Sequence, residues 1–303
     1  MRFDDEARRR LEAIYLTADV TGHRQQVLRR LAPAAGERVL DVGCGPGLLS
    51  IELARAVGSG GLVRGVDASP EMIEAATQRC AGMPRAAFGV ADAQKLPFGD
   101  AEFDVLVCTQ VLEYVPDVER ALAEFRRVMR PGARLLLMDT DWESCVWHSG
   151  DDDRMRRMIA AWDTHCPHPR LPRVLGGLLK KSGFDAVAAD ALPLVNAPTA
   201  DGTYSGAMIS MLSRYGVRKG EIPEVEARAW EADLVARSEA FFARHGDKSV
   251  FIARFTPGVR ALVPLFAFGK AHAPRTMNRH VKELPAASTL VLRRGAEPVV
   301  RRY

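Results

Sequence analysis

A glycine-rich turn beside an acidic residue is the stretch whose residue types most clearly suggest chemistry. Val39 to Val42 is typical of a short buried strand, with Asp41 near its end and glycines at 43, 45 and 47. A helical pattern begins at Leu48, so backbone N–H groups of the turn should face the carboxyl edge of a sheet, where open α/β sheets bind ligands. The carboxylate would repel phosphate and suits a ligand with an ammonium group.

The spacing of this turn disfavours a dinucleotide. The fingerprint G-x-G-x-x-G requires a third glycine at position 48, which is leucine, and Pro46 removes an N–H donor from the turn. We therefore do not expect a pyrophosphate cradle here.

Two more acids end the next two predicted strands. Asp67 follows Gly65-Val66, where a carboxylate can accept two ribose hydroxyls, and Asp92 follows Ala91, where an acid can meet an exocyclic amine. Because the carboxyl ends of parallel strands share one edge, the three acids describe a ligand with an amine, a ribose and an adenine. S-adenosylmethionine (SAM) carries these groups.

Strand patterns alternate with helical patterns around these residues, which predicts right-handed βαβ units. The predicted fold is α/β: a Rossmann-like, doubly wound, mostly parallel seven-stranded sheet with a helical insert and a C-terminal extension. We expect a helical segment over 1–36, broken near Thr21-Gly22, a SAM-binding core over 37–195, a helical substrate-covering insert over 196–248, and the last strand with a basic extension over 249–303. The predicted strands are 37–42, 61–66, 85–90, 103–108, 133–138 and 186–195, and the predicted helices are 48–57, 118–129, 171–181, one that begins at Ser69-Pro70, and two within 203–240.

Four blocks follow one another in this core, namely Val39-Leu-Asp-Val-Gly-Cys-Gly-Pro-Gly47, Gly65-Val-Asp-Ala-Ser-Pro-Glu-Met72, Ala91-Asp-Ala-Gln-Lys-Leu-Pro-Phe98 and Phe103-Asp-Val-Leu-Val-Cys-Thr-Gln-Val-Leu112. Arg127-Val-Met-Arg-Pro-Gly132 and the fifth strand come next. In this order the blocks resemble the class I SAM-dependent methyltransferases, especially the branch of quinone-biosynthesis and arsenite methyltransferases. The resemblance implies SAM as cofactor, S-adenosylhomocysteine as product, and no metal.

The resemblance also implies which residues hold the cofactor. Its methionyl end would meet the glycine turn, its ribose the acid after the second strand, and its adenine the acid after the third. The implied cofactor residues are Asp41, Gly43, Gly45, Asp67, Ala68, Met72, Asp92, Ala93 and Gln110.

Residues after the fourth and fifth strands should decide the acceptor. Methyl transfer from a sulfonium is a direct displacement, which needs alignment and exclusion of water, so a base is optional. We expect His148 or Asp141 to act as a catalytic proton acceptor. Alternatively, the loop tryptophans only pack the loop and His148 is an ordinary surface histidine. The predicted substrate residues are Tyr15, Glu113, Trp142, Trp147, Met208 and Tyr215.

The helical face with Met208 and Tyr215 either closes over an apolar substrate or packs on the sheet.

Five cysteines, an odd number, indicate reduced thiols. Their spacing, with nearby histidines, does not resemble a zinc site. Arsenite methyltransferases hold the metalloid with several thiols, but Cys44 and Cys108 belong to cofactor blocks.

The tail differs in charge from the rest of the chain. From Arg254 onward ten basic and two acidic residues give +8, whereas the remainder carries −4. Phe241 to Pro264 resembles a stretch of DedA-type membrane proteins, so Ser249 to Phe255 is either the last sheet strand or part of a remnant that visits a membrane surface. Ser288 to Arg302 suggests a hairpin.

The sequence favours an enzyme that moves a methyl group from SAM to an O-, N- or C-nucleophile of a small apolar or aromatic molecule. The alternatives are a non-catalytic SAM-binding module whose basic tail meets membrane or nucleic acid, and a metalloid methyltransferase. Thr109 to Leu112 lacks the Asn/Asp-Pro-Pro-Tyr/Phe block of many nucleic-acid methyltransferases, so no nucleic acid is expected. With no apolar stretch of about 20 residues and a charged N-terminus, we expect a cytoplasmic protein.

Overall fold

The computed structural model describes residues 11–196, 202–237, 243–254, 288–291 and 299–302, and of Val195 and the last three ranges only the backbone. The chain divides into two compact units, 1–265 and 266–303. In the second unit, β8 (Ser288–Val291) pairs antiparallel with β9 (Val299–Arg302). The pairing expected within 288–302 is confirmed. The part of the DedA-like stretch that follows Arg254 lies outside the described residues.

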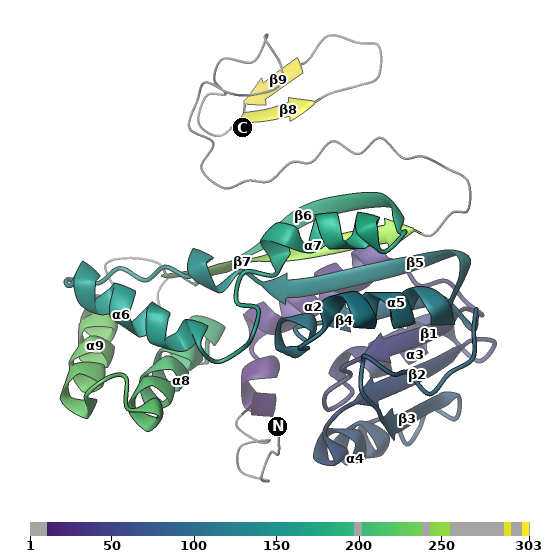
Figure 1. The fold of residues 1–303 in the computed structure, drawn as a ribbon, viewed down its shortest axis with the longest axis horizontal. Helices are drawn as coiled ribbons and strands as arrows, with labels where there is room; N and C mark the ends of the chain where they lie inside the picture. Colours follow the sequence, from purple (N-terminus) through teal and green to yellow (C-terminus); the bar gives the residue numbers. More distant parts are fainter. Residues whose placement is uncertain (1–10, 197–201, 238–242, 255–287, 292–298, 303) are drawn as a thin grey trace. The chain divides into compact units, whose positions relative to one another are not determined.

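A twisted sheet forms the centre of the first unit (Figure 1). Its strands lie in the order β3-β2-β1-β4-β5-β7-β6, with β1 to β5 parallel and β7 antiparallel to both of its neighbours. The expected α/β class with a mostly parallel sheet is confirmed. The strands are β1 (Arg38–Val42), β2 (Leu62–Asp67), β3 (Ala86–Val90), β4 (Phe103–Thr109), β5 (Met129–Thr140), β6 (Asp185–Asn196) and β7 (Ala243–Arg254).

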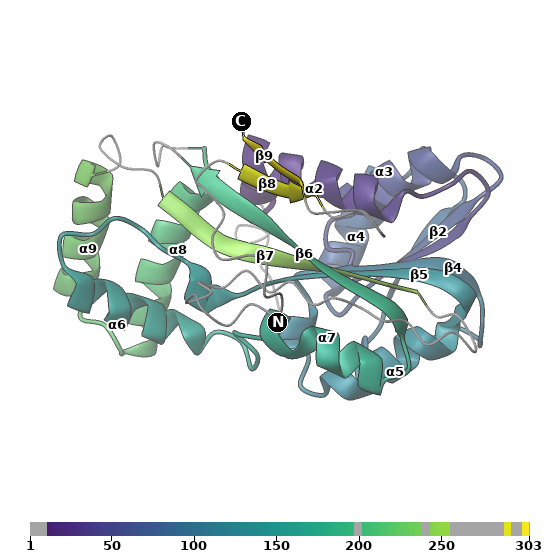
Figure 2. The same cartoon turned by 90° about the horizontal axis from the view of Figure 1, so that it is seen from above.

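Helices cover both faces of the sheet (Figure 2). Successive strand residues point to opposite faces, so Leu40 and Leu106 pack with α5 and α7, while Val39 and Val105 pack with α2 and α3. This alternation explains why the central strands are apolar throughout. The helices on the two faces are α2 (Ala18–Leu31), α3 (Leu48–Val57) and α4 (Pro70–Arg79), and α5 (Val118–Val128) and α7 (Pro172–Lys181).

Two helix ends can be compared with the start and the break that the sequence predicts. Ser69 caps α4 as expected, because its hydroxyl accepts a hydrogen bond from the Met72 N–H, and Pro70 occupies the first turn. The expected break near Thr21-Gly22 is wrong, since α2 runs through both residues. The first helix instead ends at Leu16-Thr17, where Thr17 bonds back to the Ile14 carbonyl.

A third group of helices lies beyond the carboxyl end of β5 (Figure 1). These are α6 (Asp152–Asp163), α8 (Tyr204–Lys219) and α9 (Glu224–Arg237). Two short 3-10 helices follow the central strands: η1 (Leu112–Tyr114) comes after β4, and η2 (Trp142–Ser144) lies between β5 and α6. The helices α6, α8 and α9 share with η2 one apolar cluster that includes Trp142, Trp162 and Trp230. No helix among the described residues is long and apolar enough to span a membrane.

Candidate active site

At two of its three glycines, the turn after β1 leaves no room for a side chain. Gly43 has φ +69°, and a Cβ there would lie 2.0 Å from Cγ2 of Val111. At Gly47 φ is +78°, and a Cβ would lie 2.9 Å from the Ala76 Cα. The glycines therefore allow α4 and the segment after β4 to approach the turn.

Asp67 holds the turns after β1 and β2 together. One of its oxygens accepts a hydrogen bond from the Gly45 N–H at 2.9 Å, and the other accepts one from the Ser69 N–H at 2.9 Å. A carboxylate has about four acceptor positions, so each oxygen can still receive a ligand hydroxyl. The residue is half-buried at the strand end, as a ribose-binding acid would need to be.

Asp41 lies deeper, at the end of β1. Its Oδ2 accepts a 2.5 Å hydrogen bond from the Ser50 hydroxyl. Burial, reinforced by the charge of Asp67, raises the pKa of Asp41 to about 7. A cation that reached this carboxylate would stabilise the ionised form.

The other predicted cofactor residues lie around the same edge. Asp92 is exposed after β3 and accepts the Gln94 N–H at 2.8 Å. Gln110 has φ +57°, its N–H donates to the Met138 carbonyl at 2.6 Å, and its side-chain oxygen accepts the Thr140 hydroxyl at 2.7 Å. Its strained backbone turns the chain sharply at the end of β4. Ala68 is exposed, and Met72 and Ala93 are buried.

Asp139 is a buried carboxylate that sequence reasoning did not single out. Its Oδ1 accepts the N–H groups of Val111 and Glu113 at 3.1 and 3.2 Å, and Oδ2 is buried with no hydrogen-bond partner in the described part of the chain. Burial raises its pKa well above the usual range. The sequence signal that could have identified Asp139 is its position directly after the apolar residues 135–138.

Glu113, Tyr15 and Trp142 come together on the acceptor side. Glu113 is buried after β4, and its Oε2 accepts the indole N–H of Trp142 at 2.9 Å. Burial, then the charges of Asp67 and Glu113, raise the pKa of Tyr15 to about 12. Tyr15 of the first helix is thus placed between the cofactor edge and the segment after β4.

Aromatic rings surround this position. Trp142 meets Trp162 and His165 edge to face, with ring centroids 5.4 and 4.8 Å apart. Tyr215 lies 5.3 Å from the Trp162 ring, and its hydroxyl is 3.1 Å from that of Thr164. The structure therefore brings three predicted substrate residues, Trp142, Tyr215 and Glu113, into one connected group.

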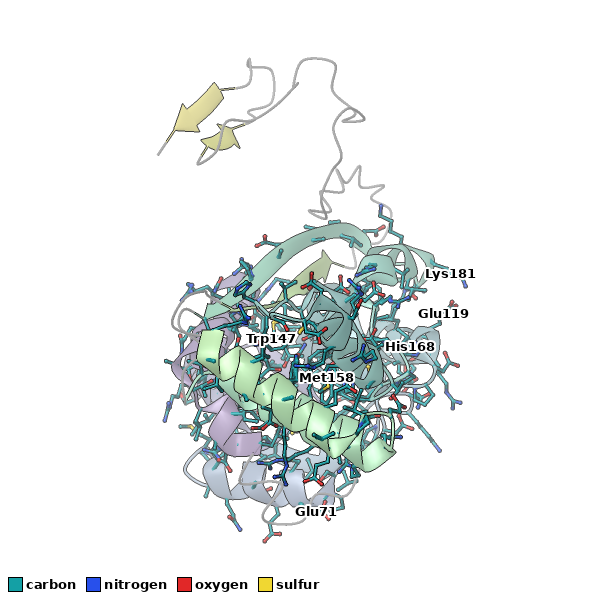
Figure 3. All side chains as sticks on the ribbon, turned by 90° about the vertical axis from the view of Figure 1, so that its left-hand side faces the viewer. Glu71, Glu119, Trp147, Met158, His168 and Lys181 are labelled. Carbon is teal, nitrogen blue, oxygen red and sulfur yellow. The ribbon has the colours of Figure 1, made fainter. Side chains whose placement is uncertain are left out.

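Trp147 and Met208 instead belong to the interior of the helical group. Trp147 packs edge to face on Trp230 of α9, at 6.2 Å, and lies beside this helix in Figure 3. Met208 is 2% exposed within α8, so its face packs inside the cluster. These placements favour the packing alternative for both residues.

The two predicted proton acceptors differ in their surroundings. His148 is exposed. Asp141 accepts a hydrogen bond from Nε of Arg173 at 2.9 Å, and the same guanidinium bonds Glu143 at 2.6 Å. This ion pair commits Oδ2 of Asp141 to a cation, while its Oδ1 is buried with no hydrogen-bond partner among the described residues.

The cysteines are all buried and free. Among the described residues, no group of three or more His, Cys, Asp or Glu side chains could hold a metal ion.

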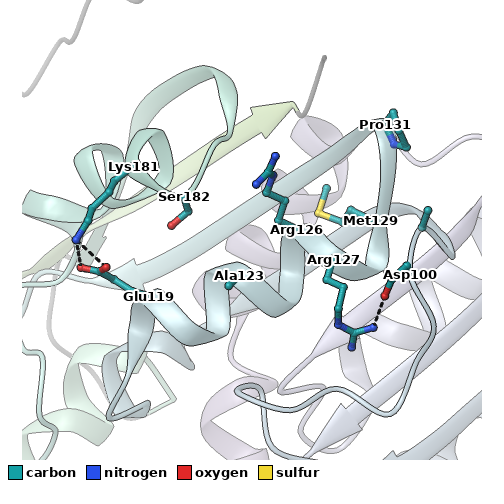
Figure 4. A pocket seen from close by; sticks show the side chains of 10 residues that line it. Asp100, Glu119, Ala123, Arg126, Arg127, Met129, Pro131, Lys181 and Ser182 are labelled. Carbon is teal, nitrogen blue, oxygen red and sulfur yellow. Dashed lines mark hydrogen bonds and ion pairs between the residues drawn. The ribbon is translucent and has the colours of Figure 1, made fainter. Parts of the chain in front are cut away.

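A groove on the α5 and α7 side contains none of the predicted site residues (Figure 4). Its charged side chains are already engaged, as in the Lys181–Glu119 and Arg127–Asp100 ion pairs.

Comparison with known proteins identifies the core. Residues 40–137 match the family model "Methyltransferase domain". These residues form a methyltransferase domain. This domain contains the glycine turn, Asp67, Asp92 and Gln110, and the family expected from the sequence blocks is confirmed.

Curated proteins are similar to part of this chain. An uncharacterized 37.1 kDa protein in transposon TN4556 of Streptomyces fradiae is 39% identical over 134 residues, which are 44% of this chain and 39% of that protein. O-methyltransferase cnsE of Penicillium expansum is 41% identical over 128 residues (41% and 46%), and demethylmenaquinone methyltransferase of Staphylococcus aureus is 38% identical over 117 (39% and 48%). The chain thus spans less than half the length of these relatives.

Solved structures share the fold at low identity. Phosphoethanolamine N-methyltransferase 2 of Haemonchus contortus, in complex with SAM, has a TM-score of 0.57 and 18% identity over 84% of this chain and 57% of that one. The [4+2]-cyclase SpnF has a TM-score of 0.52 and 21% identity over 79% of this chain and 82% of that one. These likenesses show the Rossmann-like fold.

Proposed function

We propose that this chain transfers a methyl group from SAM to a small aromatic or apolar acceptor. The observation that carries the proposal is the placement of Tyr15, Glu113 and Trp142 beside the edge where Asp41 and Asp67 end their strands. A donor site and an aromatic acceptor site would then share one edge of the sheet.

Each part of SAM has a matching group in this proposal. The buried Asp41 carboxylate and the N–H groups of the glycine turn suit the methionyl end, whose ammonium would meet this carboxylate. Both oxygens of Asp67 face the strand end and suit the two ribose hydroxyls. Asp92 and Ala93 would line the adenine, and Gln110 would stand at the edge of the cofactor near β5.

The transfer itself needs little from side chains. A lone pair of the acceptor attacks the methyl carbon, the carbon–sulfur bond breaks, and the sulfur leaves with the bonding electrons as S-adenosylhomocysteine. The protein contributes alignment and exclusion of water, for which the buried rings around Trp142 are suited. A hydroxyl or amine acceptor also releases one proton.

His148 and Asp141 stay candidates for receiving that proton, but their surroundings support a lesser role. One is exposed, and the other is ion-paired with Arg173. We therefore infer that alignment by the aromatic group, rather than proton transfer by these two residues, accounts for most of the rate.

A screen with methyl-labelled SAM tests the proposal. The full chain is incubated with pools of phenols, quinols, amines and arsenite, and label in the product is counted. We expect label in an aromatic pool, and a higher acceptor Michaelis constant in Trp142→Ala than in the matched change Trp147→Ala. Binding of SAM without transfer to any pool would support the non-catalytic alternative, and label in the arsenite pool alone would support the metalloid alternative.

A further inference from the structure

His165 lies beside the proposed acceptor site although it stands far from it in the sequence. The segment after α6 is bonded to the ends of two adjacent strands: the His168 N–H donates to the Glu113 carbonyl at 3.2 Å, and the Trp142 N–H donates to the Pro169 carbonyl at 3.0 Å. Glu113 follows β4 and Trp142 follows β5. These bonds hold the imidazole next to the aromatic group.

Rings enclose the imidazole on several sides. It stacks on Trp162 with centroids 4.0 Å apart and planes 17° apart. Trp142, Tyr114 and Tyr215 approach it edge to face at 4.8, 5.6 and 6.4 Å. Planar, apolar surroundings of this kind suit a planar aromatic ligand.

The hydrogen bonding of the imidazole fixes its tautomer. Nδ1 lies 2.6 Å from the Trp162 carbonyl oxygen, which can only accept, so Nδ1 carries the proton and Nε2 carries the lone pair. Nε2 is buried and has no hydrogen-bond partner among the described residues. Burial lowers the pKa of His165 to about 4, which keeps the ring neutral near pH 7.

An unpartnered buried acceptor is costly, and a ligand group that donates to it removes the cost. The other histidines of this region do not offer one: Nε2 of His168 bonds the Pro116 carbonyl at 3.3 Å, and His148 is exposed. We propose that His165 Nε2 accepts a hydrogen bond from a hydroxyl group on a planar aromatic acceptor and so positions it. This inference rests on the proposed function and narrows its substrate class to hydroxylated aromatic molecules.

Two probes of nearly the same shape test this. 1-Naphthol donates a hydrogen bond and 1-methoxynaphthalene does not. Quenching of tryptophan fluorescence measures their dissociation constants for the full chain, with and without S-adenosylhomocysteine. We expect 1-naphthol to bind at least tenfold more tightly than the ether.

Variants of His165 test whether Nε2 causes the tighter binding of 1-naphthol. His165→Asn keeps a donor toward the Trp162 carbonyl but has no atom at the Nε2 position, so the two affinities should become equal within about twofold. The amide oxygen of His165→Gln reaches that position and should restore part of the preference. His168→Gln is the matched control and should keep the full preference; thermal unfolding checks that each variant folds.

Equal binding of the two probes to the native chain, no saturable binding of 1-naphthol, or an undiminished preference in His165→Asn would overturn the inference. The last result would mean that a buried water or another group satisfies Nε2. Because the probes are measured without turnover, these outcomes are distinct from failure of the proposed function, which would appear as absent SAM binding or absent methyl transfer.

Discussion

Asp41 and Asp67 end neighbouring strands, but their surroundings give them different properties. Asp67 accepts two backbone N–H groups, and it is accessible at the strand end. Asp41 is 1% exposed and accepts a hydrogen bond from Ser50 through Oδ2, and its burial raises its pKa to about 7. The free protein therefore holds a proton on Asp41 over much of the acidic range, and a cationic ligand would displace it.

This difference predicts that SAM binding depends on pH. The SAM ammonium favours ionised Asp41, so binding below pH 7 must first release the proton, and affinity should fall as pH decreases. Between pH 7.5 and 5.5 we expect roughly a tenfold weakening, within the limit of tenfold per pH unit for one linked proton. Calorimetric titration across this range measures it. Asp41→Asn should bind more weakly at pH 7.5 and show a flat profile; an equally steep profile in that variant would assign the proton elsewhere.

The glycine turn predicts graded stability losses. Gly45 has φ +51° with open space around its Cβ position, so Gly45→Ala should cost only the left-handed backbone penalty of about 1–2 kcal/mol. Gly47→Ala adds a clash with the Ala76 backbone and should cost clearly more. Urea unfolding compares the two variants. A smaller loss for Gly47→Ala than for Gly45→Ala would contradict the close approach of α4.

At the scale of elements, Arg79 links the first helix to the glycine turn. Its Nε donates to the Pro46 carbonyl at 2.7 Å, and its guanidinium also pairs with Glu12. Arg79 stands in the last turn of α4, so one side chain joins three segments of the proposed cofactor site. Tyr15 lies one turn beyond Glu12 on the same helix.

We expect Arg79→Met to loosen the helix that carries Tyr15. Hydrogen exchange of residues 11–17 should become faster, and SAM affinity should fall severalfold because Tyr15 is no longer held over the edge. Arg55→Met, an exposed change at the end of α3, is the matched control. Unchanged exchange of residues 11–17 would show that packing of α2, and not this ion pair, holds the segment.

The elements that could be predicted from sequence are those whose local pattern and tertiary surroundings agree. β1, β2 and β4 are short apolar runs that end in turn or polar residues, and α3 has its expected bounds and α4 begins at the expected Pro70. α6 was missed because its first six residues include two aspartates and three arginines and it buries only Met158, Ala161 and Trp162. Its place in the fold comes from packing on α8 and α9, which no local pattern contains.

The same reasoning applies to the site. Glycines and acids at strand ends could be located because topology alone brings strand ends to one edge. Asp139 and His165 could not, since their importance comes from burial and from missing partners, which depend on contacts between distant segments. Trp147 and Met208 show the converse, because their residue types suit a ligand site but the fold uses them in packing.

At the scale of the whole molecule, the predicted cofactor residues all precede Val111, and among the described residues the last strand of the large sheet ends at Arg254. A chain ending at Arg254 should therefore keep SAM affinity within about threefold of the full chain. Calorimetric titration of both forms checks this, with circular dichroism as the control for folding. A folded truncated chain that no longer binds SAM would assign the basic extension a direct part in the site.

The central claim is that SAM binds at the edge formed by β1 and β2. Calorimetric titration of the full chain and of Asp67→Asn tests it most directly, with Asp190→Asn, an exposed ion-paired acid of β6, as the matched control. Hydrogen bonds to a charged acceptor contribute about 1.5–3 kcal/mol, so Asp67→Asn should weaken SAM binding at least tenfold while the control leaves it unchanged. A folded Asp67→Asn protein that binds SAM as tightly as the native chain would contradict the account.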